Sequence, residues 1–161
     1  MKILIGCEFS GIVREAFRKK GHEAWSCDII PSDDNSPYHI QDDILNHLDD
    51  NYDMLICFPP CTHLCSSGAR WFKDKIPQQK EALEFVKKLL NCNIPKIALE
   101  NPIGIISTRI KKPTQIIQPY QHGHGETKST CLWLKNLPKL KPSNIVKGRE
   151  ARIHNMPPTK D

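Results

Sequence analysis

Residues 53–61 read DMLICFPPC, a short apolar run that ends at Pro59-Pro60 and is followed directly by Cys61. An apolar run bounded by turn residues predicts a buried strand. The prolines end it, because proline cannot donate to a strand ladder. They also restrict the backbone that leads into the cysteine. The stretch therefore predicts a buried strand with a thiol held in a defined direction at its carboxyl end.

The rest of the chain repeats this alternation of apolar strands with helical patterns. Apolar periodicity, Ser10 as a helix cap, Gly21 as a helix end and a loop over 31–39 together give a set of predicted elements. Strands are expected at 2–6, 23–28, 53–57, 96–99 and 131–134, and helices at 11–20, 44–48 and 77–91. Strands that alternate with helices predict an α/β fold, with a mostly parallel sheet and helices on both faces.

Length and composition favour one soluble domain. The chain has 161 residues, enough for a single compact core, and we expect one domain over 1–161. Residues 1–104 would form its core, and 105–161 an irregular, proline-rich, basic part. No apolar run is long enough for a membrane span or a signal peptide, so a cytoplasmic location is expected. Seven cysteines, an odd number, argue against a closed disulfide framework.

Charge is divided unevenly along the chain. The net charge is +5, but residues 1–60 hold five Lys/Arg against eleven Asp/Glu, and residues 61–161 hold eighteen against seven. A basic second half suits a polyanionic partner such as nucleic acid. An uneven but otherwise ordinary surface explains the same counts, and charge alone does not separate the two interpretations.

Chemically useful residues follow four of the predicted strands. Residues 8–11 follow the first, Asp28 the second, 59–61 the third, and Glu100-Asn101 the fourth. Ligands of doubly wound folds bind at the carboxyl ends of the strands. An acid, a glycine, a thiol and a second acid at these ends therefore predict an active site.

Cys61 and Glu100 form the central pair of this site. A thiol attacks as its thiolate, which needs an electropositive setting that His63 or Arg70 could supply. A neighbouring carboxyl can bind and protonate a ring nitrogen while sulfur adds to the ring. The alternative for Cys61 alone is a buried structural cysteine.

A zinc site is a second alternative, with ligands from Cys57, Cys61, His63, Cys65, His122 and His124. Asp28 and Asp43 also have plain alternatives, a solvated carboxylate and a helix cap.

In chain order, these segments resemble the DNA cytosine-C5 methyltransferases, most closely the small phage and prophage type. Phe9-Ser10-Gly11-Ile12 is similar to the family's first motif, and Pro60-Cys61 to its catalytic Pro-Cys. Glu100-Asn101 is similar to its Glu-Asn. The resemblance implies a Rossmann-like class I methyltransferase domain and S-adenosylmethionine as cofactor. It also implies that Cys61 adds to cytosine while Glu100 protonates the ring.

The same resemblance assigns roles to individual residues. Catalytic roles fall to Cys61, Glu100 and Asn101. Cofactor binding falls to Phe9, Ser10, Gly11, Ile12, Asp28, Ile29, Asp43, Ile44 and Pro59, and substrate binding to Pro60, Ser67, Gly68, Arg70 and Lys128. DNA is the implied partner, no metal is implied, and a homo-oligomer or partner subunit could complete the site.

Three departures from the family leave alternatives open. The family's arginine-bearing motif is missing, since Arg109, Lys111 and Lys112 are poor substitutes, and no separate target-recognition domain is expected. The family's last helix, which closes the cofactor pocket, is not found either. The substrate could therefore be a single strand or a nucleotide rather than duplex DNA. An inactive remnant that binds nucleic acid or protein, a zinc module, and an amino-methyltransferase with a Pro-Pro loop are the other hypotheses.

Overall fold

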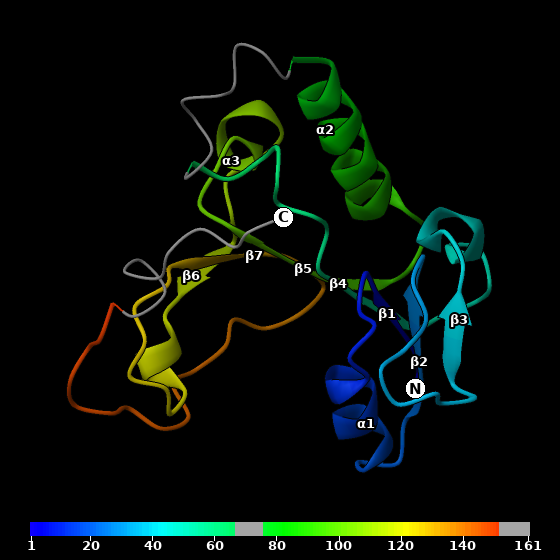
Figure 1. Ribbon diagram of the computed structural model, residues 1–161, viewed down its shortest axis with the longest axis horizontal. Coiled ribbons are helices and arrows are strands. Elements are labelled where there is room, and N and C mark those ends of the chain that lie inside the picture. The colour runs from blue at the N-terminus through cyan, green and yellow to red at the C-terminus, as the bar shows by residue number, and fades with distance from the viewer. Residues whose placement is uncertain (67–75, 152–161) are drawn as a thin grey trace.

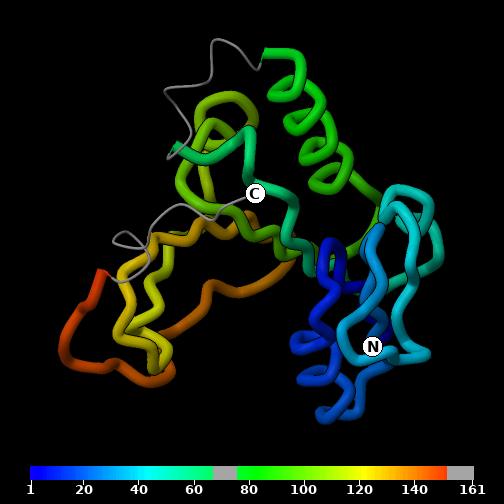
Figure 2. Tube along the Cα trace, viewed as in Figure 1, coloured from blue at the N-terminus to red at the C-terminus, as the bar shows by residue number. Residues whose placement is uncertain are grey.

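The computed structural model describes residues 1–66 and 76–151 (Figures 1 and 2). Its elements are β1 (Lys2–Gly6), α1 (Ile12–Arg18), β2 (Glu23–Asp28), β3 (His39–Gln41), η1 (Ile44–His47), β4 (Met54–Cys57), α2 (Ile76–Asn91), β5 (Lys96–Pro102), α3 (Ile106–Arg109), β6 (Gln115–Ile117), η3 (Pro119–Gln121) and β7 (Thr130–Lys135). Within these two ranges, no helix is both long enough and apolar enough to cross a membrane.

The described strands form one seven-stranded sheet in the order β3-β2-β1-β4-β5-β7-β6. Strands β1 to β5 pair in parallel, and β7 runs antiparallel between β5 and β6. The predicted mostly parallel sheet is therefore confirmed. β1 lies between β2 and β4, so the chain reverses its direction of winding there, which is where doubly wound folds bind ligands.

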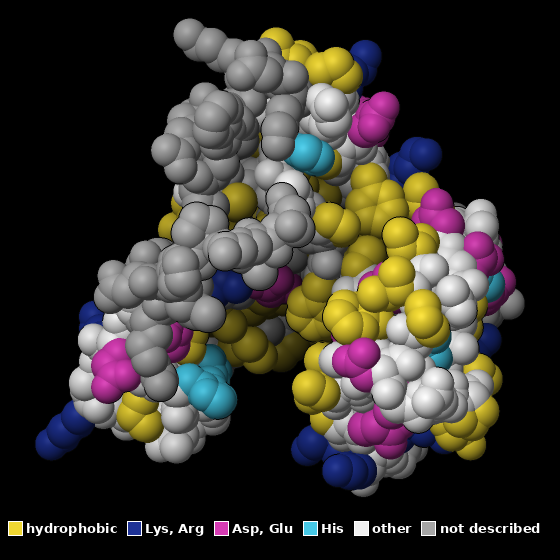
Figure 3. Space-filling view, viewed as in Figure 1, with side chains coloured by type: hydrophobic (Ala, Val, Ile, Leu, Met, Phe, Trp, Pro, Cys, Tyr) yellow, Lys and Arg dark blue, Asp and Glu magenta, His cyan; other side chains and the backbone are white. Residues whose placement is uncertain are grey.

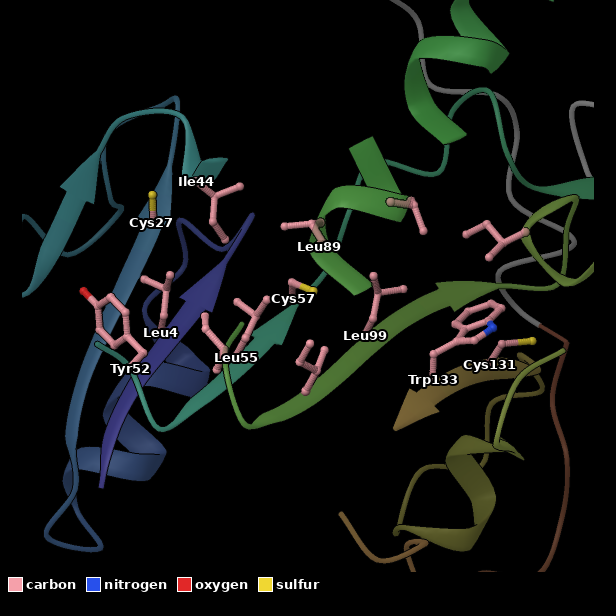
Figure 4. Packing of buried hydrophobic residues seen from close by; sticks show 14 of the residues in the cluster. Leu4, Cys27, Ile44, Tyr52, Leu55, Cys57, Leu89, Leu99, Cys131 and Trp133 are labelled. Carbon is pink, nitrogen blue, oxygen red and sulfur yellow. The ribbon is translucent and has the colours of Figure 1, made fainter. Parts of the chain in front are cut away.

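Helices cover both faces of this sheet (Figure 1), as predicted. Successive side chains of a strand point to opposite faces, and β1 shows this directly. Ile3 and Ile5 pack with Val13 and Phe17 of α1 on one face. On the other face, a larger core joins β1, β2, β4, β5 and β7 to α2, as Figure 4 shows. Its members include Leu4, Leu55, Leu99, Val86, Leu89 and Trp133.

Several elements differ from prediction: β5 extends to Pro102 instead of ending at residue 99, and α3 and η3 were not predicted. α1 spans seven residues rather than ten, and Gly11, at φ +73°, is its N-cap in place of Ser10. Residues 44–47 form a 3₁₀ helix. β3 begins inside the predicted loop 31–39, and β6 was not predicted. Three-residue strands at the sheet edges give no apolar alternation, because few of their side chains reach the core.

The segment after β7 has no helix or strand up to residue 151, in line with its many prolines. Two isolated bridges tie it back to the segment after η3, one between His122 and Asn144 and one between Glu126 and Glu150. This segment packs beside β6 and η3 (Figure 2). In the space-filling view, a notch separates this part of the molecule from the part built by β1, β2, β3 and α1 (Figure 3).

Candidate active site

The parallel strands end level with one another, which brings their following loops to one edge of the sheet. Gly6 of β1 pairs with Cys27 of β2 and with Cys57 of β4, and Cys57 pairs with Leu99 of β5. The strand-end residues singled out in the sequence therefore lie along this edge, whereas Ser67, Gly68 and Arg70 fall outside the described residues.

The Pro59–Cys61 loop leaves β4 and turns at the cysteine. Pro59 is buried, Pro60 is exposed and Cys61 is half-buried. The Cys61 carbonyl accepts hydrogen bonds from the N–H groups of Leu64 (2.9 Å) and Cys65 (3.0 Å). The nucleophile candidate thus begins a closed turn, so its backbone direction is fixed by main-chain hydrogen bonds as well as by the prolines.

Asn101 attaches this loop to β5. Its side chain is 1% exposed, and Nδ2 donates to the Pro59 carbonyl at 2.8 Å. A buried carbonyl without a donor is costly, so this bond selects one position for the loop. The role that the structure gives Asn101 is to position the residues before Cys61.

A second attachment joins the loop to the segment after β5. The N–H of Ser66 donates to the Ile103 carbonyl at 3.0 Å, and the N–H of Ile105 donates to the Leu64 carbonyl at 2.8 Å. Gly104 lies between these bonds, where a Cβ atom would stand 1.9 Å from the Leu64 carbonyl oxygen. Only glycine permits this approach, so Gly104 is a requirement of the site that the sequence did not reveal.

Lys128 lies near enough to Cys61 and to Glu100 to act on the charge of each. Thr130 of β7 pairs with Pro102 of β5, which brings the residues before β7 next to the end of β5. The pKa of Cys61 is raised by burial and by Cys65, while the Lys128 ammonium acts to lower it. Burial also raises the pKa of Glu100, again opposed by Lys128. One cation therefore acts on both the thiol and the carboxyl.

A cavity of about 670 Å³ opens beside this group, between the loops after β1, β2, β3 and β4 and the helix α2. Four of the predicted cofactor residues line it: Asp28, Ile29, Asp43 and Ile44. Pro60 and His63 line it as well, so the cavity reaches the loop that carries Cys61. The cavity has the volume of a small-molecule site.

Helix α2 supplies a wall of the cavity that was not predicted. Its contributing residues are Gln78, Glu81, Ala82, Glu84, Phe85 and Lys88. The amphipathic pattern of 77–91 revealed which face packs on the sheet, and it could not show that the neighbouring face borders a cavity. Together with Asp28 and Asp43, the two glutamates make this cavity acidic.

The other predicted cofactor residues lie at the same edge without lining the cavity. Phe9 and Ile12 are exposed, with 40% and 73% of their surface accessible, and Pro59 is buried. Ser10 donates to Glu8, a carboxylate only 7% exposed whose other oxygen has no partner among the described residues.

Gly11 has a structural reason for its identity. It stands over Arg14, which is fully buried, and a Cβ atom there would lie 2.4 Å from an Arg14 nitrogen. Arg14 donates to Ser26 at 2.7 Å and to Glu15 at 3.0 Å, and it also pairs with Asp34. This buried arginine could not be predicted, because in the sequence it resembles any cation on the surface of a helix.

Asp43 forms the helix cap that was one of its predicted roles. It caps η1 by accepting from the N–H of Leu45 at 2.9 Å, and it also lines the cavity. The adjacent Asp42 accepts from the Asp43 N–H and from His47, and both bonds lower the pKa of the Asp42 carboxyl. Burial acts to lower the pKa of His47, but its bonds to Asp50 and Asp42 outweigh burial and raise it.

Two further thiols of the cavity are held protonated. Burial, reinforced by Asp28, raises the pKa of Cys7 to about 12. Burial and Asp42 raise the pKa of Cys27 to about 12. Across residues 1–66 and 76–151, no group of three or more His, Cys, Asp or Glu side chains is arranged to hold a metal ion. The zinc hypothesis therefore finds no support in the described part of the chain.

Comparison with known proteins identifies the class of fold. The chain matches no known protein family and no curated protein. Among solved structures it is similar to a "putative DNA modification methyltransferase encoded within prophage" of E. coli, with 15% sequence identity and a TM-score of 0.51. The match covers 83% of this chain and 46% of that chain, so this chain spans about half of its structural relative. The protein thus has a Rossmann-like methyltransferase fold.

Proposed function

We propose that this protein transfers a methyl group from S-adenosylmethionine to C5 of a cytosine, with Cys61 as covalent nucleophile. The observation that carries the proposal is that one cation, Lys128, acts on both the Cys61 thiol and the Glu100 carboxyl. Asn101 and the hydrogen bonds on either side of Gly104 hold the loop that carries Cys61 in place. A thiol, a carboxyl and a cation at one strand edge form the set that addition to a pyrimidine ring requires.

The cavity fits the cofactor by its chemistry. Asp28 and Asp43 present carboxylates that accept hydrogen bonds, as ribose hydroxyls and an adenine amine require. Ile29 and Ile44 add apolar surface, and the cavity ends at Pro60, next to the nucleophile. An acidic cavity also suits a cofactor that carries positive charge. When bound, S-adenosylmethionine supplies an activated methyl group.

The residues of the chain would perform the ring chemistry. The Cys61 thiolate forms a bond to C6, and the displaced electron pair is stabilised as Glu100 gives its proton to N3. Burial raises the pKa of Glu100, which keeps that proton available to higher pH. C5 is now nucleophilic and accepts the methyl group. Loss of the C5 proton to a base, with return of the N3 proton, then breaks the sulfur–C6 bond and releases Cys61.

DNA is the substrate class that the supporting observations favour. The structural relative is named for DNA modification, and residues 61–161 carry an excess of eleven positive charges. Lys128 places one of these charges at the nucleophile itself. A cytosine in a duplex would have to leave the base stack to reach Cys61.

The test is covalent capture. With 5-fluorocytosine DNA and S-adenosylmethionine, fluorine replaces the proton that must leave, so the adduct cannot break down. We expect a denaturation-resistant protein–DNA species with the wild type and with Cys92→Ser, and none with Cys61→Ser. Calorimetry with S-adenosylhomocysteine measures cofactor binding separately, and Asp43→Asn should weaken it. Absence of both adduct and binding would overturn the proposal and favour an inactive nucleic-acid- or protein-binding domain.

A further inference from the structure

Cys61 has a second thiol next to it. The Cys61 and Cys65 side chains are hydrogen-bonded to each other, and both residues are half-buried. The N–H of Cys65 also donates to the Cys61 carbonyl at 3.0 Å, which closes a single turn between them. Four residues of such a turn advance the chain by about 6 Å. Disulfides join Cα atoms that are roughly 4.4–6.8 Å apart, so this backbone can accept one.

The other cysteines are less suited to oxidation. All seven lie in the described residues, none is in a disulfide, and Cys27, Cys57 and Cys131 are buried in the core. Cys7 and Cys27 are neighbours, but burial raises the pKa of each to about 12, which leaves little thiolate at neutral pH. Burial and Cys65 raise the pKa of Cys61 as well, but the Lys128 ammonium acts to lower it and so favours the thiolate.

Hydrogen bonds to the segment after β5 hold the turn that joins Cys61 and Cys65 in place. Cys65 forms an antiparallel bridge with Gly104, and its neighbours Leu64 and Ser66 bond to Ile105 and Ile103. Both ends of the turn are therefore anchored, Cys61 by the Pro59 carbonyl bond to Asn101 and Cys65 by this bridge. A turn anchored at both ends keeps the backbone positions of Cys61 and Cys65 close together, which favours an intramolecular disulfide over other oxidation products.

We infer that Cys61 and Cys65 form a reversible disulfide when the protein meets a hydroperoxide. The Cys61 thiolate attacks the peroxide, forms a sulfur–oxygen bond and releases hydroxide or alkoxide, which gives a sulfenic acid. The Cys65 sulfur then attacks the Cys61 sulfur, its proton leaves with the departing hydroxyl as water, and the disulfide closes. A dithiol reverses the step by thiol–disulfide exchange.

The modification would switch off the candidate nucleophile without damaging it. This consequence rests on the proposed function, because only a catalytic Cys61 gives the disulfide an effect on activity. A sulfur already bound to Cys65 cannot add to C6, and it is also protected from irreversible oxidation to the sulfinic acid. The disulfide itself is expected whether or not the protein is an enzyme.

Thiol counting by mass spectrometry tests the inference. The full chain is treated with a small excess of hydrogen peroxide, denatured, alkylated with N-ethylmaleimide and weighed intact. The wild type should fall from seven alkylated cysteines to five, and dithiothreitol should restore seven. Cys65→Ser should keep all six of its thiols free of disulfide, and Cys61→Ser serves as the second variant if Cys65→Ser does not fold. The matched control Cys92→Ser should fall from six to four.

Two outcomes would overturn the inference. In one, the wild type keeps seven alkylated thiols under conditions that oxidise free cysteine. In the other, Cys65→Ser and Cys61→Ser still lose two, which would assign the disulfide to another pair. In a separate experiment the 5-fluorocytosine capture is repeated after oxidation. We expect no adduct until dithiothreitol is added. Failure of capture in the reduced protein would count against the proposed function and leave the thiol count as it stands.

Discussion

The two sides of the candidate site are held together by different interactions. On the β4–β5 side, uncharged hydrogen bonds fix the loop of Cys61, through Asn101 and the close approach at Gly104. On the β1–β2 side, charged groups fix the loops that border the cavity, through Arg14 and through His47 between two aspartates. The folding stability of the nucleophile side should therefore depend little on pH and salt, and this side should not tolerate added volume. The folding stability of the cavity side should depend on pH and salt, and that side should tolerate added volume.

Gly104→Ala should have the largest effect. The new Cβ would meet a backbone oxygen at 1.9 Å, and neither loop can move without breaking the bonds on either side. Overpacking of this kind costs about 3 kcal/mol of unfolding free energy. Urea unfolding measures the loss, and DNA capture by Cys61 should fall with it. Gly125→Ala is the control, because its nearest neighbour would lie at 3.6 Å; equal stability of the two variants would contradict the tight approach.

Arg14→Met should come second and act on the cavity side. It removes a fully buried guanidinium and leaves the Ser26 hydroxyl without that partner. Loss of a buried charged hydrogen bond costs about 2 kcal/mol. We expect a lower denaturation midpoint, with weaker binding of S-adenosylhomocysteine. Lys20→Met, at an exposed position two residues after the same helix, should leave both unchanged. A result in which Arg14→Met reduces thiol reactivity at Cys61 but spares cofactor binding would contradict the division into two sides.

Lys128→Met should change rate rather than stability. Because Lys128 lowers the pKa of Cys61, its removal should raise that pKa and reduce the thiolate present at neutral pH. The rate of adduct formation should fall several-fold at pH 7 and recover as the pH rises. The pH–rate profile is the measurement, and Lys128→Arg should restore it. If the pH midpoint of the profile stays the same and only the maximal rate falls, Lys128 binds substrate and does not act on the pKa of Cys61.

His47→Gln should have the smallest effect, and one that depends on pH. The folded-state pKa of His47 is raised above its unfolded value, so its stabilising contribution is complete below the unfolded pKa and disappears as pH rises through the folded one. Its partners are nearly half exposed, which keeps the contribution small. The melting temperature should fall by no more than about 3 °C at pH 5.5 and stay unchanged at pH 9. An equal fall at both pH values would indicate lost packing instead.

The sequence predicted the strand-end arrangement well, for a physical reason. Buried parallel strands are apolar runs with clear ends, so the bounds of β2 were predicted correctly and those of β4 to within one residue. The amphipathic pattern of α2 likewise predicted the bounds of that helix to within one residue. Once the sheet is parallel, the residues after each strand must share one edge. The placement of Asp28, Cys61 and Glu100 at one edge of the sheet was therefore predictable without any contact being known.

What the sequence could not reveal depends on contacts between distant segments. Arg14 has the spacing of a surface residue, and only the loop that returns with Asp34 buries it. Gly104 is one glycine of eight, and its need for space is set by the Leu64 carbonyl forty residues earlier. The thiol pair of Cys61 and Cys65 depends on a turn that no periodicity marks. Such features are visible in the folded chain alone.

Hydrogen exchange at C5 of cytosine tests the central claim most directly. Addition of Cys61 to C6, with Glu100 at N3, makes C5 basic enough to take up deuterium from heavy water, and no methyl transfer is needed. DNA is incubated with the protein and S-adenosylhomocysteine in heavy water, and the recovered cytosine is weighed. We expect deuterium at C5 with the wild type, much less with Glu100→Gln and none with Cys61→Ser. Exchange that persists in Cys61→Ser, or no exchange in the wild type, would contradict it.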